Sequence, residues 1–237
     1  MTFLTDLSSG RFPSVSINRE TLDYRELVPI EEGLSGVTNS TSKYPIIGTM
    51  DVYDCIAGLG WFPDYGVAFS FHIASPFNVK WQQVENERNG SRNLLYPLFD
   101  RLEKAVWLLN PDAQAELNLV GGVRGPHSGF CYTTAANLEC LGKALEQRKG
   151  ITVKSATLVT DIRAAAIDSR NGRISTTGHR LQRGYADYFS KAYDNTFDGV
   201  KEYFGEGGIM PAEIQFDGTL LKHQFSPEEL KARPRVR

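Results

Sequence analysis

Residues 55–74 have the sequence CIAGLGWF-PDYG-VAFSFHIA, and this stretch decides the fold. Two apolar runs, residues 55–62 and 67–74, flank the segment PDYG at 63–66. Proline fixes one backbone angle, and glycine adopts conformations that strain other residues, so this segment favours a chain reversal. The stretch therefore predicts a β-hairpin.

The hairpin brings one thiol and one imidazole close together. A two-residue loop at Pro63-Asp64 puts Cys55 directly opposite His72, with Cβ atoms about 4.5–5.5 Å apart. A four-residue loop makes the pair diagonal but keeps it on one face, whereas a three-residue loop separates the faces. A thiolate is a nucleophile and an imidazole can accept its proton, so the pair is a candidate catalytic site. The alternative is that both are ordinary core residues.

Separate helices and further strands are predicted around the hairpin. Apolar residues recur at three- and four-residue steps in two stretches, which is typical of amphipathic helices. Asn171-Gly172 predicts a tight turn between the last two strands. Hairpins mixed with separate helices predict an α+β fold. The predicted elements are helices over 94–109 and 134–147 and strands over 44–49, 116–120, 151–159, 163–167 and 173–177.

The two ends of the chain differ from its centre. Residues 1–40 are rich in Ser, Thr, Asn and Gly without sustained periodicity, which predicts an N-terminal arm or irregular cap. Residues 41–180 contain the predicted elements and form the predicted core domain. Residues 181–237 begin with recurring Tyr and Phe, which predicts an aromatic-rich helical extension. The length of 237 residues is that of one domain with sizeable extensions.

Composition and charge narrow the class of protein. Hydrophobic residues make up 41% and charged residues 23%, as in soluble globular proteins. The net charge of −2 gives no electrostatic reason to expect a nucleic acid or an anionic membrane as partner. No apolar run is long enough to span a bilayer, and residues 1–11 lack the pattern of a secretory signal. We expect a cytoplasmic protein, or one delivered to a host cytosol without a classical signal peptide.

The cysteines and histidines argue against a disulfide scaffold and a metal site. Cys55, Cys131 and Cys140 are widely spaced and form no C-x-x-C pair, which predicts reduced thiols. The four histidines show no zinc-type spacing. The glycine-rich segments lack the phosphate-loop and dinucleotide patterns, and no G-x-S-x-G elbow occurs. We therefore expect neither a metal nor an organic cofactor.

One more side chain, that of Thr49, extends the candidate site beyond the hairpin. Thr49 stands six residues before Cys55, and His72 stands seventeen after it. His72 heads an H-x-x-x-P stretch, and the predicted strand over 116–120 ends in the double glycine Gly121-Gly122. This order resembles that of the CheD family of chemoreceptor glutamine deamidases, and of the wider group that includes the cytotoxic necrotizing factor catalytic domains. In that family a threonine, the catalytic cysteine and a histidine stand at the same intervals.

The resemblance spans about residues 44–178, and it implies both a fold and an activity. The implied fold is α+β, with stacked β-sheets forming a β-sandwich core flanked by helices. The implied site is a triad of Cys55, His72 and Thr49 that hydrolyses a glutamine side-chain amide on a protein substrate, without a cofactor. Backbone N–H groups of Asp54 and Cys55 would stabilise the oxyanion. The extensions at both ends lie outside the compact family core, which favours the protein substrate of an effector or toxin.

Other interpretations stay open at this point. One is another enzyme on the same scaffold, such as a transglutaminase-like enzyme or an N-terminal amide hydrolase. A second is a non-catalytic protein-binding module that retains the fold. Asp54 favours the module, because a carboxylate facing the sulfur opposes formation of the thiolate. A third is a structural domain in which the triad spacing arose by chance.

Overall fold

The computed structural model describes the central part of the chain and some of the N-terminal residues. Two of its helices are α1 (Phe3–Ser8) and α3 (Tyr132–Glu146), and a short π-helix, η3, spans Glu103–Trp107. The described residues are 3–9, 11–15, 26–30, 35–42, 44–50, 52, 55–73, 94–96, 98–100, 102–122, 132–148, 150–158 and 162–178.

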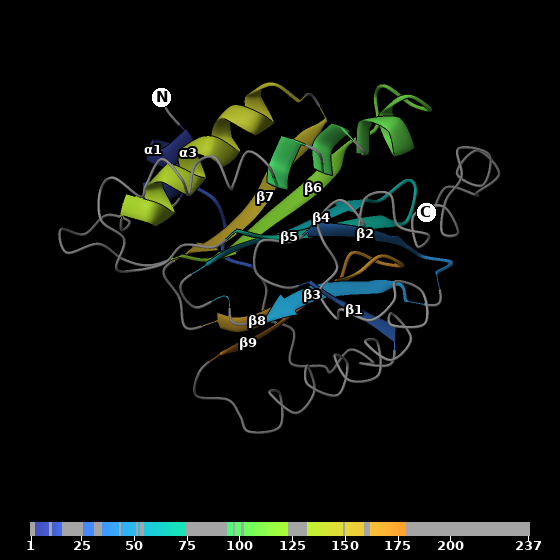
Figure 1. Cartoon of the computed structure of the whole chain (residues 1–237), viewed down its shortest axis with the longest axis horizontal. Helices are drawn as coiled ribbons and strands as arrows, with labels where there is room; N and C mark the ends of the chain where they lie inside the picture. Colours follow the sequence, from blue (N-terminus) through green and yellow to red (C-terminus); the bar gives the residue numbers. More distant parts are fainter. Residues whose placement is uncertain are drawn as a thin grey trace, which may run out of the picture.

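Nine strands of this described part form two sheets (Figure 1). The first sheet has the order β1-β3-β8-β9, and the second has the order β2-β5-β4-β6-β7. We call them the four-stranded and the five-stranded sheet. The strands are β1 (Leu27–Ile30), β2 (Ser35–Asn39), β3 (Ile46–Met50), β4 (Ile56–Phe62), β5 (Val67–Ile73), β6 (Ala115–Gly121), β7 (Ile151–Leu158), β8 (Ile162–Asp168) and β9 (Ile174–Gly178).

The two sheets pack face to face, and α3 lies on the outer side of the five-stranded sheet (Figure 1). One apolar cluster lies between the sheets and takes Ile47 and Ile167 from one sheet and Leu59 from the other. A second cluster joins the outer face of the five-stranded sheet to α3, where Phe69 meets residues such as Leu141. The α+β prediction is therefore confirmed, with two sheets and few helices.

Of the loops of two, three and four residues considered from the sequence, the β4–β5 hairpin has the four-residue loop. Phe62 pairs with Val67, so residues 63–66 form the loop. Tyr65 N–H donates to the Phe62 carbonyl at 3.1 Å, and Gly66 adopts a φ of +57° that favours glycine. In this register His72 lies opposite Ala57 rather than opposite Cys55.

The predicted helix ends and later turns agree with the structure within a few residues. The helix predicted over 134–147 is α3, and Gly150 follows it with a φ of +89°. A Cβ at Gly150 would lie 2.7 Å from the Ala113 carbonyl oxygen, so only glycine fits. The turn after β8 contains Gly172, with a φ of +69°, as predicted.

The expectation of an irregular arm over residues 1–40 is wrong. This region supplies α1, β1 and β2, and each of these strands is an edge strand of one sheet. β1 pairs in parallel with β3, and β2 pairs antiparallel with β5. Strands of four and five residues are too short to show a periodicity, and partners elsewhere in the chain stabilise them. The predicted extension over 181–237 lies outside the described residues.

Among the described helices, none has the length and apolar character needed to cross a membrane.

Candidate active site

Two residues of the predicted triad, Thr49 and His72, come from different sheets and are in contact between them. Thr49 lies in β3 of the four-stranded sheet, and His72 lies in β5 of the five-stranded sheet. Cys55 directly precedes β4, two residues before Ala57, the cross-strand partner of His72. Because side chains alternate along a strand, Cys55 and His72 belong to the same face, on a diagonal. This face of the five-stranded sheet is the one that packs against the four-stranded sheet.

Thr49 fixes the position of the proton on the imidazole. The Thr49 hydroxyl donates to the Ile30 carbonyl oxygen at 2.6 Å, and its oxygen also lies 2.6 Å from His72 Nδ1. A hydroxyl has a single proton, and a carbonyl can only accept. Since that proton goes to Ile30, Nδ1 must carry a hydrogen and donate it to Thr49. The hydrogen-bond network thus assigns the tautomer with a bare lone pair on Nε2.

Burial keeps this imidazole neutral. His72 is 1% exposed, and desolvation lowers its pKa from 6.5 to about 4. The charged form is disfavoured because burial removes the water that would solvate it. Nε2 is buried and forms no hydrogen bond with a described residue. At neutral pH the ring is therefore an uncharged base with an unused lone pair.

The backbone of Cys55 is held by the double glycine at the end of β6. Gly122 N–H donates to the Cys55 carbonyl oxygen at 2.6 Å. Gly121 has a φ of +97°, and a Cβ there would lie 2.1 Å from the same oxygen. No residue type with a Cβ can approach the Cys55 carbonyl so closely at position 121. The double glycine therefore positions the residue that carries the thiol. Sequence reasoning noted this glycine pair but did not include it among the site residues.

The predicted oxyanion donors are described only in part. Asp54 lies outside the described residues. Cys55 N–H donates to the Val52 carbonyl oxygen at 3.3 Å, which is long for a hydrogen bond of this type. An oxyanion would therefore have to compete with Val52 for this amide.

A further buried hydroxyl, that of Ser70, lies on the same face of β5 as His72. Ser70 is fully buried, and its Oγ has no hydrogen-bond partner among the described residues. The sequence analysis did not single it out, because a lone serine in an apolar strand has no local signature. The available signal was its position two residues before His72 in β5, which puts both side chains on one face of the strand.

The described residues hold no group of three or more His, Cys, Asp or Glu side chains that could bind a metal ion. Cys55 and Cys140 are both thiols in the structure, and neither is joined in a disulfide. Cys131 lies outside the described residues. The chemistry available at this site is that of a thiol, an imidazole and a hydroxyl.

A scan against models of known protein families finds no match for this chain, and neither does a search of curated proteins.

Proposed function

We propose that the protein is a cysteine-dependent amidohydrolase that converts a glutamine side chain of a protein substrate to glutamate. The single observation that carries the proposal is the Thr49–His72 contact. It leaves the Nε2 lone pair of a neutral imidazole on the face that also bears Cys55. The choice of glutamine as substrate is supported by the triad spacing, which resembles that of CheD and the cytotoxic necrotizing factors.

The reaction uses one proton carrier in both halves. His72 Nε2 accepts the Cys55 proton while the sulfur attacks the carboxamide carbon, which gives a tetrahedral oxyanion. The imidazolium returns the proton to the nitrogen, the C–N bond breaks, and ammonia leaves behind a thioester. Nε2 then accepts a proton from water, the hydroxide attacks the thioester carbon, and the C–S bond breaks as the imidazolium returns its proton to the sulfur. The products are glutamate and the regenerated thiol.

The low pKa of His72 indicates how the resting state is arranged. With a pKa of about 4, the ring is neutral at pH 7, and a neutral ring pairs with a thiol rather than a thiolate. Charge then develops only as the substrate is attacked. Thr49 stabilises the imidazolium as well as the neutral ring, because Nδ1 keeps its proton in both forms.

The proposal is tested by ammonia release from a library of peptides that each contain one internal glutamine. The wild-type protein should release ammonia and give the mass change of an amide converted to an acid, at glutamine. The variant Cys55→Ala should do neither while keeping the circular dichroism spectrum of the wild type. Ammonia release by Cys55→Ala at the wild-type rate would refute the role of the thiol. Added primary amines should leave the product unchanged, since their incorporation would identify a transglutaminase-like enzyme.

A non-catalytic binding module is the second candidate, and the burial of the site favours it. Cys55 is only 6% exposed, and no hydrogen bond joins Nε2 to its sulfur. Catalytic contacts are often loose without substrate and tighten when it binds, so the geometry fits both candidates. Iodoacetamide at neutral pH separates them. An active thiol should be alkylated faster in the wild type than in His72→Asn, whereas an inert buried thiol should react slowly in both.

A further inference from the structure

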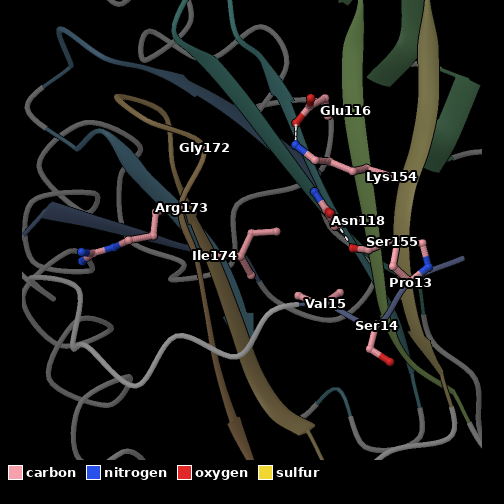
Figure 2. Close-up of a pocket in the computed structure, with 10 residues that line it drawn as sticks. All are labelled: Pro13, Ser14, Val15, Glu116, Asn118, Lys154, Ser155, Gly172, Arg173 and Ile174. Atoms are coloured by element: carbon pink, nitrogen blue, oxygen red, sulfur yellow. Dashed lines mark hydrogen bonds and ion pairs between the residues drawn. The ribbon is translucent and has the colours of Figure 1, made fainter.

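A cleft lies where the edge of the five-stranded sheet faces the β8–β9 hairpin (Figure 2). Its volume is about 360 Å³, and its walls come from β6, β7, the segment 13–15 and the hairpin residues 172–174. It is separate from the candidate active site, because β7 lies three strands from the His72 strand in the sheet order. Pockets of this size are typical of small-molecule sites.

Two buried polar side chains lie inside this cleft. Asn118 and Ser155 are each 6% exposed, and the Ser155 hydroxyl donates to Asn118 Oδ1 at 2.6 Å (Figure 2). Asn118 Nδ2 donates to the Leu59 carbonyl oxygen at 3.3 Å. A carboxamide has two N–H groups and two oxygen lone pairs. These bonds leave Asn118 with one unused N–H and one unused oxygen lone pair. A second carboxamide could pair with both, by accepting from the N–H and donating to the oxygen.

The remaining walls combine apolar contact with the charged residues Glu116, Lys154 and Arg173. Val15 and Ile174 belong to the apolar cluster between the sheets and line the cleft. Lys154 and Glu116 form an ion pair at its other end, where their side chains are 57% and 35% exposed. The Arg173 side chain extends away from the other labelled residues (Figure 2). The cleft therefore presents no net charge, and it matches a zwitterion better than an ion.

We propose that this cleft binds a free amino acid with a carboxamide side chain, with glutamine as the first candidate. The side-chain amide would hydrogen-bond to Asn118, and the methylene groups would pack on Val15 and Ile174. The ligand carboxylate would meet Lys154, and its ammonium group would meet Glu116. The existing ion pair is exposed, and such pairs contribute little, so exchanging it for the ligand costs little. The proposal does not depend on the chemistry of Cys55.

Isothermal titration calorimetry on the full-length Cys55→Ala protein tests the site without turnover. L-Glutamine should bind with a dissociation constant in the millimolar range or below. L-Norleucine loses both hydrogen bonds to Asn118, and L-glutamate replaces the amide NH₂ with a charged oxygen that cannot donate to Asn118, so both should bind about tenfold more weakly. Equal binding of norleucine or glutamate would overturn the proposal. So would the absence of glutamine binding at about 10 mM, well above a millimolar dissociation constant.

Protein variants test the roles of Asn118 and of the Glu116–Lys154 pair separately, and a glutamine derivative with blocked amino and carboxyl groups tests whether the ligand must be a free amino acid. Asn118→Leu should weaken binding about tenfold, as removal of the amide from the ligand does, and the double variant Glu116→Gln, Lys154→Gln should weaken it severalfold. The double variant changes exposed side chains, so it keeps the test valid if Asn118→Leu fails to fold. Thr152→Ala, at an exposed position of β7, is the matched control. It should bind glutamine as tightly as the Cys55→Ala protein does. N-acetylglutamine amide distinguishes a peptide from a free amino acid, and its binding as tightly as glutamine would overturn the zwitterion assignment.

Discussion

Replacing the buried imidazole should change how the stability of this protein depends on pH. His72 has a pKa of about 4 in the fold, against 6.5 in the unfolded chain. Between these values the unfolded state binds more protons than the folded state, so the free energy of unfolding rises with pH in this window. The penalty that His72 imposes on the fold is absent well above pH 6.5 and grows as the pH falls toward 4.

The magnitude follows from the two pKa values. At about pH 5 the unfolded imidazole is almost fully protonated and the folded one is mostly neutral, which costs the fold about 2 kcal/mol. Above neutral pH the same term is close to zero. The wild type should therefore lose about 2 kcal/mol more than a variant without the titrating group when the pH falls from neutral to about 5.

His72→Asn is the variant of choice, because its amide nitrogen can still donate to Thr49 from near the Nδ1 position. Urea unfolding followed by tryptophan fluorescence, near pH 7 and near pH 5, gives the two free energies for each protein. Carboxylates also titrate in this range, but they are common to both proteins and cancel in the difference. An equal pH dependence of wild type and variant would refute the buried neutral base, and with it the proton acceptor of the proposed mechanism.

The remaining predictions concern the groups around the imidazole and the thiol. Thr49→Val should lower ammonia release about tenfold or more and shift the His72 ring ¹⁵N resonances, whereas Thr49→Ser should retain both, as expected for a partner that orients a catalytic histidine. Gly121→Ala should destabilise the protein by about 1–3 kcal/mol and also abolish ammonia release, because the new Cβ displaces the Cys55 carbonyl. Gly150→Ala, at another glycine with positive φ, is its control and should lower stability but leave ammonia release intact; a loss of activity in both would contradict a specific role for Gly121. Trp61→Phe removes the indole bond to the Ser169 carbonyl and should cost about 0.5–1.5 kcal/mol without affecting activity, measured by urea unfolding and ammonia release.

Local signals predicted the elements that depend on nearby residues. The segment at 63–66 indicated the chain reversal, and apolar steps at helical spacing indicated α3. The parity of the loop limited Cys55 and His72 to one face in both even registers, although the sequence alone could not choose between these registers. These features follow from turn chemistry and periodicity, which act over a few residues.

Contacts between distant segments decided the rest. β1 and β2 are too short to show a pattern, and pairing with β3 and β5 forms them. The Ile30 carbonyl, from the segment expected to be irregular, accepts the Thr49 proton and thereby sets the tautomer of His72. The sequence thus predicted the candidate side chains, Cys55 and His72, and limited the loops that would place them on one face. Only the packing of one sheet on the other determined which ring nitrogen of His72 keeps its lone pair, because the hydroxyl that accepts from Nδ1 and the ring itself belong to different sheets.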